Sequence, residues 1–198
     1  MPIELANPDL AILTAAYLLG SVSSAVLVCQ LLDLPDPRNA GSHNPGATNV
    51  WRTGSHRAGM ITLLADLLKG ALPVWLAQQL NFAHDTVLLC GLAAMLGHLF
   101  PVYSRFHGGK GVATFLGTSL ALQPLLAMIQ FGLWLLLAKA SRQASRASIT
   151  TALLTPILCY WLSPADLTML SLMAALLIIR HSSNIKKILH GTESRLDL

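Results

Sequence analysis

The sequence predicts an all-α integral membrane protein with about seven transmembrane helices, some of them short, and three observations lead to this fold class. Hydrophobic residues make up 54% of the chain and charged residues only 11%, which is far from the composition of an ordinary soluble domain. Several apolar runs approach or exceed the roughly 20 helical residues that span a bilayer core. Basic residues collect in the connections between these runs. We therefore expect one membrane-embedded domain over residues 1–198.

The first three apolar runs are each long enough for one crossing. They cover Asp9–Leu32, Ala58–Leu80 and Thr86–Tyr103. The next run is too long for one comfortable crossing and is broken by Gln123 and Pro124, and another break falls at Ser163 and Pro164. These breaks predict four shorter helices, whose small length a thinner local bilayer can accommodate: Val112–Leu122, Leu125–Ala138, Ser148–Leu162 and Asp166–Ile179.

The distribution of basic residues tests this count, because merging the helices on either side of Pro124 would move every later loop to the opposite face. With the helices kept separate, twelve of the 13 Lys and Arg residues fall in connections 33–57, 104–111 and 139–147 and in the tail 180–198, which all share one face. The twelve are Arg38, Arg52, Arg57, Arg105, Lys110, Lys139, Arg142, Arg146, Arg180, Lys186, Lys187 and Arg195.

The positive-inside bias predicts that this basic face is cytoplasmic, with the N-terminus outside and the C-terminus in the cytoplasm. No basic residue precedes the first apolar run, and that run is too long for the core of a signal peptide, so we expect the first helix to be retained. This topology indicates a multi-pass membrane protein.

The net charge of +4 does not indicate a nucleic-acid-binding protein, because the basic residues sit in short loops rather than in a stripe or an arm. Anionic lipid headgroups or small anionic substrates are the expected partners. The three cysteines all fall within apolar runs and form no CxxC pair, so we assign them to packing, without disulfides or metal. No cofactor or metal is expected, and the sequence does not indicate an oligomeric state.

The first basic connection is rich in small, turn-forming and amide-bearing residues. It reads Asp36-Pro-Arg-Asn-Ala-Gly-Ser-His-Asn-Pro-Gly-Ala-Thr-Asn-Val-Trp-Arg52. Gly41 and Gly46 permit unusual backbone dihedrals, and the hydrogen-bonding side chains close to Arg52 are Ser42, Asn44, Thr48 and Asn49. Such a concavity suits an anion. The same residues also occur in a plain polar connector, and that alternative stays open.

The second basic connection reads His107-Gly-Gly-Lys-Gly-Val-Ala-Thr114 and leads directly into a predicted helix. Free backbone amides at the N-terminus of that helix and the Lys110 ammonium can converge on a phosphate, and the amides belong to Gly108, Gly109 and Gly111. The alternative is a glycine-rich interfacial turn with a snorkelling Lys110. A nucleotide-hydrolysing P-loop is disfavoured, because Ser104 and Gly111 stand where that motif needs Gly and Ser or Thr.

A third polar group follows the last crossing. His181 and Asn184 are three residues apart, so on a continuing helix they would share a face and act on one ligand. Arg180 reads equally well as a helix-end anchor or as a ligand contact.

Three ionisable residues fall inside predicted crossings. His98 is better explained as a buried, hydrogen-bonded histidine than as a ligand. Asp66 and Lys69 are three apart on one helix and can neutralise each other, although a position bordering the site is also open.

Several familiar chemistries have no residues to support them. The chain lacks a His-x4-Asp signature, an HExxH zinc motif and a Gly-x-Ser-x-Gly elbow, so a soluble-donor glycerolipid acyltransferase, a zinc protease and a serine hydrolase are all disfavoured.

Taken together, five motifs in order closely resemble the bacterial acyl-phosphate:glycerol-3-phosphate acyltransferases, the PlsY family. The resemblance covers nearly the whole chain, including its length and hydropathy pattern. The motifs are Gly41-Ser-His-Asn-Pro-Gly-Ala-Thr-Asn-Val-Trp-Arg52, Ala65-Asp-Leu-Leu-Lys-Gly70, Gly97-His-Leu-Phe-Pro101, Gly108-Gly-Lys-Gly-Val-Ala-Thr114 and Arg180-His-x-x-Asn-Ile185.

The resemblance implies a seven-helix enzyme of phospholipid biosynthesis that transfers a fatty acyl group from acyl phosphate to the sn-1 hydroxyl of glycerol 3-phosphate, giving lysophosphatidic acid and phosphate. It also implies functional residues at these positions: Ser42, Arg52, Lys110, His181, Asn184 and, less distinctly, Ser145. One departure is His43, where the family usually has glycine, so a positive φ there would strain the backbone. Gly191-Thr-Glu193 also looks family-like, but no role follows for it.

The residue pattern and the resemblance lead to one mechanistic hypothesis. Acyl phosphate is a mixed anhydride with a good leaving group, so positioning and charge stabilisation should dominate catalysis. Arg52 and Lys110 would hold phosphate groups, and the backbone amides of both glycine loops would cradle the donor phosphate. His181 and Asn184 would orient the attacking hydroxyl, with either His181 or a donor phosphate oxygen accepting its proton.

Two other classes of protein share some of these features. A small anion or phosphate permease would have the same hydropathy, but its polar residues should converge near mid-membrane on broken helices. A non-catalytic membrane scaffold would give no reason for glycine-lysine loops and a His/Asn pair on one face.

Overall fold

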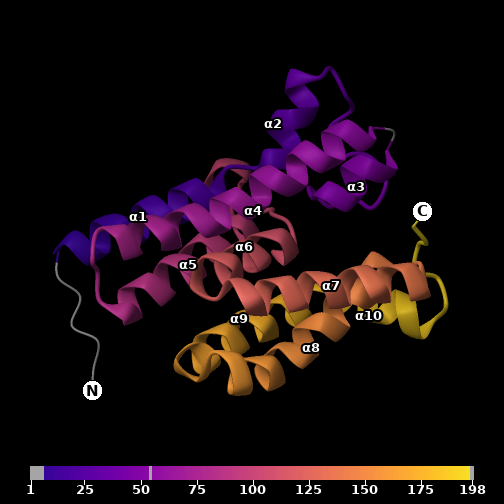
Figure 1. Cartoon of the computed structure of the whole chain (residues 1–198). Coiled ribbons are helices and arrows are strands. Elements are labelled where there is room, and N and C mark those ends of the chain that lie inside the picture. Colours follow the sequence, from indigo (N-terminus) through magenta and orange to yellow (C-terminus); the bar gives the residue numbers. More distant parts are fainter. Residues whose placement is uncertain (1–6, 54, 197–198) are drawn as a thin grey trace.

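The computed structural model describes residues 7–53 and 55–196, and every regular element within those residues is helical. Figure 1 shows the helices as one elongated bundle. Gly54 and residues 197–198, which belong to the predicted connection 33–57 and to the predicted tail, lie outside the described residues. The all-α fold class is therefore confirmed.

The first apolar run is not one helix as predicted but two, α1 (Asn7–Ser21) and α2 (Ser24–Leu31), which meet at an angle of 47°. The Lys69 ammonium of a neighbouring helix donates a 2.9 Å hydrogen bond to the carbonyl oxygen of Val22, at the break between them. This bond satisfies a backbone group that the interrupted helix leaves without an internal partner. The prediction of one continuous crossing over Asp9–Leu32 was wrong in this respect.

The next helices agree closely with the sequence. The short helix α3 (Ala47–Arg52) lies within the first connection, and α4 (His56–Gln79) and α5 (His84–Leu99) follow, with a 3-10 turn, η1, at Val102–Ser104. The predicted break at Gln123 is confirmed, since α6 (Val112–Leu122) ends there and α7 (Pro124–Ser141) begins with Pro124 at its first position. Proline is well suited to that position because its missing N–H would have no helical partner.

The last helices differ from the prediction in two ways. Helix α8 (Ala144–Leu162) begins four residues before the predicted Ser148 and has 19 residues, so it is not a short segment. After the turn η2 (Pro164–Asp166), α9 (Leu167–Arg180) and α10 (Ser182–Leu189) meet at 57°. His181 therefore lies at a bend rather than on the continuing helix that we expected.

The helices are those of an integral membrane protein, but they differ in their capacity to span a bilayer. Within the described residues, α4, α5 with η1, and α7 are long and apolar enough, and counting each bent pair as one span raises this number from three to five. Helix α6 is apolar but shorter. The count of seven crossings therefore stays a prediction.

Helices α4 and α6 belong to the N-terminal half of the chain (α1–α6), and they pack with their backbones in close approach. A methyl group added to Gly70 on α4 would lie 2.1 Å from the carbonyl oxygen of Thr114, and one added to Gly117 on α6 would lie 2.0 Å from that of Leu67. Glycine permits this approach because it has no Cβ. The α4–α6 contact therefore holds the connection before α6 in a fixed position.

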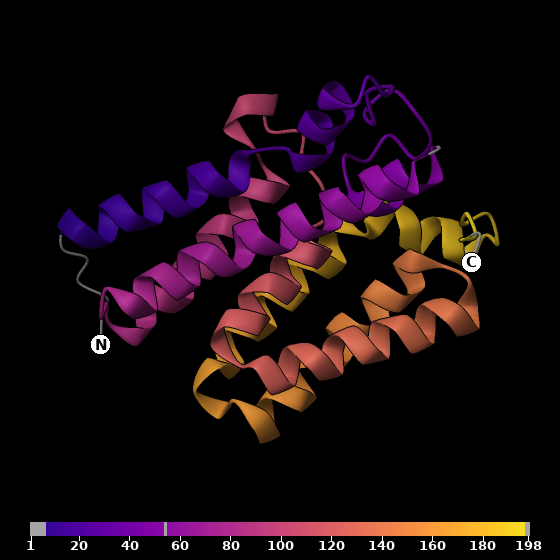
Figure 2. The same ribbon diagram turned by 45° about the horizontal axis from the view of Figure 1, so that its top comes forward.

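Helices of the C-terminal half pack through polar side chains as well as apolar ones. Gln130 of α7 donates to the hydroxyl of Thr155 on α8 at 3.1 Å, and the indole N–H of Trp134 donates to the hydroxyl of Ser148 at 2.9 Å. Figure 2 shows α7 and α8 side by side, with α4 on the other side of α6. An apolar core that includes residues of α5, α6, α7, α8 and α9 joins the two halves.

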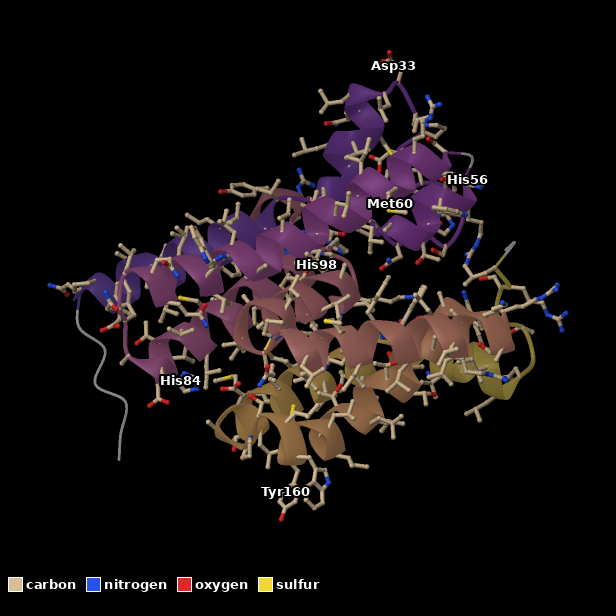
Figure 3. All side chains as sticks on the ribbon, in the orientation of Figure 1. Asp33, His56, Met60, His84, His98 and Tyr160 are labelled. Atoms are coloured by element: carbon tan, nitrogen blue, oxygen red, sulfur yellow. The ribbon has the colours of Figure 1, made fainter. Side chains whose placement is uncertain are left out.

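The ionisable residues inside the bundle form one cluster. Lys69 and Asp66 are 2.8 Å apart, with side chains 5% and 4% exposed, and the Nδ1 of His98 lies 3.6 Å from the same Asp66 oxygen. Figure 3 shows His98 among the helices, whereas Tyr160 lies at the periphery. Asp66 and Lys69 neutralise each other, as one alternative predicted, which is how a buried charge is best accommodated. Asp66 also lines the cavity described below, so the other alternative, a position bordering the site, is present as well.

Candidate active site

Segments that are far apart in the sequence meet around one cavity of about 390 Å³. It is bordered by the first connection with α3, the start of α6, the start of α8, the bend between α9 and α10, and the chain around Glu193. Eleven of the 13 predicted site residues line it: Ser42, Asn44, Gly46, Thr48, Asn49, Arg52, Lys110, Gly111, Ser145, His181 and Asn184. The two that do not are Gly108 and Gly109. The predicted gathering of the polar segments is therefore present in the fold.

The side chain of Asn49 organises the first connection. Its Oδ1 accepts the backbone N–H of Ser42 at 2.8 Å, and its Nδ2 donates to the carbonyl oxygens of Pro37 and Ala40 at 2.8 and 3.0 Å. These bonds occupy its amide, so the predicted substrate contact through this side chain is replaced by a role in shaping the loop. His43 has a φ of +58°, the strained conformation that we expected if this position requires a positive angle.

Arg52 ends the short helix α3 and borders the cavity. Its Nε is buried, and no described residue accepts a hydrogen bond from it. A buried guanidinium donor without an acceptor is costly, and a carboxylate or phosphate satisfies it with two parallel bonds. Arg52 is therefore suited to hold an anion in the cavity.

Lys110 reaches the cavity from the connection between η1 and α6. Its ammonium donates a 2.6 Å hydrogen bond to the Oδ1 of Asn184, joining the N-terminal and C-terminal halves. Burial lowers the pKa of Lys110 to about 8, partly offset by the negative charge of Glu193. At neutral pH the group still carries its charge, and together with Arg52 it makes this end of the cavity cationic.

Gly108 and Gly109 lie behind the cavity, where they pack against α5 and α9. A methyl group added to Gly109 would lie 2.1 Å from the Nε2 of His98, and the N–H of Gly109 already donates to the His98 carbonyl at 3.1 Å. The guanidinium of Arg180 donates to the carbonyl oxygens of both glycines at 3.1 to 3.3 Å. The predicted phosphate contact through the Gly109 amide is therefore wrong, because that amide is used within the fold.

His181 lies just beyond the end of α9, at the loop end of the bundle, and lines the cavity. Its Nδ1 is 2.8 Å from the carbonyl oxygen of Leu177, which fixes the tautomer with the proton on Nδ1 and leaves Nε2 as an acceptor. Burial lowers the pKa of His181 to about 4. The imidazole is therefore neutral at physiological pH and can accept a hydrogen bond from a hydroxyl.

Glu193 lines the cavity, although no role followed for it from the sequence analysis. Its Oε1 accepts the hydroxyl of Ser145 at 2.7 Å and the Nδ2 of Asn184 at 2.8 Å, and its carbonyl oxygen accepts from Gln143 at 3.3 Å. The Asn184 amide is thereby oriented with its oxygen toward Lys110. The family-like peptide around Glu193 was the available signal, but the fold-back onto α8 is a long-range contact without a local pattern.

The remainder of the cavity is mostly apolar and reaches the outer surface of the bundle. Its walls include Met60, Phe131 and Leu135, which are 45%, 43% and 47% exposed. In an integral membrane protein such residues face lipid. A ligand with an anionic head at Arg52 and Lys110 and an alkyl chain along this groove would therefore match both ends of the cavity.

The family model for glycerol-3-phosphate acyltransferase matches residues 10–191. The chain belongs to this family. A glycerol-3-phosphate acyltransferase of Thioalkalivibrio sulfidiphilus is 49% identical over 188 residues, covering 94% of this chain and 93% of the relative. One of Pasteurella multocida is 46% identical, with 91% and 90% covered.

The fold is shared with solved members of the family. The crystal structure of PlsY, an integral membrane glycerol 3-phosphate acyltransferase, in its glycerol 3-phosphate form matches with a TM-score of 0.90 and 36% identity, covering 96% of each chain. Its lysophosphatidic acid form matches with a TM-score of 0.89. Within residues 7–53 and 55–196, no three or more His, Cys, Asp or Glu side chains gather closely enough to hold a metal ion.

Proposed function

We propose that this protein transfers a fatty acyl group from acyl phosphate to the sn-1 hydroxyl of glycerol 3-phosphate, producing lysophosphatidic acid and phosphate. The observation that carries the proposal is the cavity itself, which joins a cationic end at Arg52 and Lys110 to an apolar groove at the lipid surface. Membership of the family supports glycerol 3-phosphate as the acceptor. A relative solved in a lysophosphatidic acid form supports the product.

Acyl phosphate is the donor that we propose, and its chemistry simplifies the demands on the site. Its phosphate is already a good leaving group, so no covalent acyl-enzyme is needed, and catalysis reduces to positioning and charge stabilisation. The unpaired Nε of Arg52 and the ammonium of Lys110 are the groups that would bind the two phosphates. In this scheme the acceptor oxygen attacks the acyl carbon, the bond from that carbon to the phosphate oxygen breaks, and phosphate leaves.

The attacking hydroxyl would be oriented by His181 and Asn184. The Nε2 of His181 is free to accept the hydroxyl hydrogen bond, while Asn184 is held between Lys110 and Glu193. The lowered pKa of His181, caused by burial, makes its imidazole a weak base. This favours an oxygen of the donor phosphate as the final proton acceptor, with His181 as a positioning group.

A permease for small anions is the alternative, and the location of the polar groups disfavours it. Transport requires binding groups near the middle of the membrane. The cationic groups of this cavity gather instead at the loop end, and Asp66, which also lines the cavity, is neutralised by Lys69. We propose that this loop end faces the cytoplasm of a bacterial inner membrane, with the N-terminus outside.

The donor is tested with purified protein in liposomes and labelled glycerol 3-phosphate. We expect labelled lysophosphatidic acid with acyl phosphate and none with acyl-CoA or acyl carrier protein. Product from a thioester would contradict the proposed donor. Uptake of label without product would favour the permease.

The site is tested by replacing Arg52 with alanine and comparing this variant with the same substitution at another arginine of the same connection. Arg38→Ala is the control, because Arg38 is exposed and paired with Asp36 outside the cavity. We expect at least about a hundredfold loss of kcat/KM for Arg52→Ala, in line with losing a charge-assisted contact, and nearly normal turnover for Arg38→Ala. Equal activity in both variants would remove Arg52 from the site.

The proton acceptor is tested with His181→Ala. If a donor phosphate oxygen accepts the proton, kcat falls but the shape of its pH profile survives. Disappearance of a limb of that profile would identify His181 as the base.

A further inference from the structure

The inner end of the apolar groove includes polar residues of α7 and α8. Along α8, cavity-lining residues begin near Ser145 and end at Thr151 and Ala152, and along α7, which runs the opposite way, the innermost lining residue is Gln130. At 1.5 Å per residue, Thr151 lies about 9 Å deeper along the helix axis than Ser145. The groove therefore has a definite inner end, and Gln130 and Thr151 lie at it.

These two residues carry hydrogen-bonding atoms that the fold does not satisfy. Gln130 is 3% exposed, and its amide N–H donates to Thr155, yet its Oε1 has no partner among the described residues. The hydroxyl of Thr151, a residue 8% exposed, is likewise unpaired in the described part of the chain. Buried polar atoms of this kind are met by water or by a ligand, because leaving them bare is costly.

A glutamine here is unusual for its surroundings. It lies near the middle of a helix apolar enough to span a bilayer, where a polar side chain normally has a specific partner or purpose. Its neighbours in the groove wall, Phe131 and Trp134, present the apolar surface that an alkyl chain would follow. The lining of the groove therefore changes from apolar side chains to an unpaired amide at Gln130.

We propose that Gln130 and Thr151 form a polar stop that limits the length of the acyl chain this enzyme accepts. The inference rests on the proposed acyl-phosphate donor. Each added methylene that enters the apolar part should favour binding by roughly fourfold. A methyl group that reaches Gln130 meets a buried amide oxygen to which it cannot hydrogen-bond, so chains beyond that length should lose about tenfold instead.

The experiment measures kcat/KM for a series of straight-chain acyl phosphates of increasing length, with wild-type protein and with Gln130→Leu. The wild-type values should rise and then fall past a limiting length. Leucine is similar in size but apolar, so the limit should move to longer chains and the ratio of long to limiting donors should rise about tenfold. Phe131→Leu is the matched control, since it enlarges the same stretch of wall without altering the amide, and it should leave the limit in place.

A second comparison separates polarity from simple volume. A donor just longer than the limit, but with a hydroxyl on its terminal carbon, offers the Gln130 oxygen a hydrogen bond. Wild-type protein should use this donor several-fold better than the unsubstituted chain of equal length, and Gln130→Leu should reverse that order. If Gln130→Leu does not fold, the comparison of these two donors with wild-type protein still tests the proposal.

The outcomes distinguish the inference from the function on which it rests. Identical chain-length profiles for wild type and a folded Gln130→Leu, or no benefit from the terminal hydroxyl in wild type, would overturn the polar stop. A shift in Phe131→Leu equal to that in Gln130→Leu would assign the limit to volume and overturn it as well. Failure of wild-type protein to use any acyl phosphate would instead overturn the proposed donor.

Discussion

The two walls of the cavity are built by different physical means. Helices α4 and α6 meet backbone to backbone at Gly70 and Gly117, whereas α7 and α8 are joined by hydrogen bonds between side chains such as Trp134 and Ser148. The first contact leaves no space for an added atom, because the atoms it would meet belong to the main chain. The second consists of replaceable side chains. We call the α4–α6 side the fixed wall and the α7–α8 side the variable wall, because only the second is held by contacts that a side-chain substitution can remove.

The comparison also explains why the cationic groups lie where they do. Arg52 ends α3 shortly before α4 begins, and Lys110 lies just before α6. Both residues therefore lie on the fixed wall. His181 and Asn184 come from the α9–α10 bend in the other half, and the 2.6 Å bond from Lys110 to Asn184 joins the halves. The two cationic groups are thus held on the fixed wall, where small displacements would be most costly to a reaction that depends on positioning.

The largest expected effect comes from comparing a substitution at Gly117, on the fixed wall, with one at Gly132, on the variable wall. Gly117→Leu forces a Cβ to within 2.0 Å of the Leu67 carbonyl oxygen, whereas nothing lies within 4 Å of a Cβ added at Gly132 on α7. We expect Gly117→Leu to lose the folded protein, a cost above about 3 kcal/mol, and Gly132→Leu to change stability by less than about 1 kcal/mol. Size-exclusion profiles and thermal unfolding in detergent measure both, and a stable Gly117→Leu would refute the rigid wall.

The second prediction concerns the bond that joins the halves. Burial lowers the pKa of Lys110 to about 8 from its usual value near 10.5, so its ammonium is present below that pH and is lost as pH rises through it. We expect kcat/KM for glycerol 3-phosphate to fall above pH 8, approaching tenfold per pH unit. Lys110→Arg keeps its charge and should lose this alkaline limb, whatever its absolute rate. Identical limbs in the two proteins would show that another group titrates.

The third prediction concerns a substitution that removes one hydrogen bond of the variable wall and leaves its other contacts in place. Trp134→Phe removes the hydrogen bond to Ser148, whose own hydroxyl keeps its bond to the Ala144 carbonyl. We expect a loss of about 1 kcal/mol in unfolding free energy and a less than tenfold change in kcat/KM. A double-mutant cycle with Ser148→Ala isolates the bond, and a coupling energy near zero would mean that this hydrogen bond does not stabilise the α7–α8 contact.

The smallest expected effect lies in the first connection. His43 adopts a φ of +58°, and glycine would relieve the strain while losing the 3.1 Å contact between the imidazole Nδ1 and the Arg38 carbonyl. The gain outweighs the greater entropy of glycine in the unfolded chain only slightly, so His43→Gly should raise stability by about 0.5 kcal/mol. Thermal unfolding tests this, and a clear decrease would show that the side chain, rather than the backbone angle, stabilises the loop.

Local signals in the sequence predicted the breaks that depend on local chemistry. Gln123 and Pro124 mark the end of α6 because proline cannot continue the preceding helix. The break at Val22 and Ser23 has no such residue, and the Lys69 ammonium that meets the Val22 carbonyl comes from a helix 47 residues later. A contact of that separation leaves no trace in the hydrophobic pattern of the first run.

The site was predictable to the extent that its residues lie in compact polar motifs. Ser42, Arg52, Lys110, His181 and Asn184 all line the cavity. The internal uses of polar groups were not predictable, because a free amide and an occupied amide look the same in a sequence. Those groups were the amide of Asn49, the N–H of Gly109 and the carboxylate of Glu193.

The attachment of the C-terminal segment has a practical consequence for anyone who labels this protein. The backbone N–H of Leu196 donates to the Arg142 carbonyl oxygen at 2.6 Å, three residues after the carboxylate that orients Asn184. We expect that an affinity tag or fluorescent fusion appended directly after this segment would disturb the cavity. Attached ahead of Asn7, where α1 begins beside the start of α5, the same fusion would hang from the other end of the bundle.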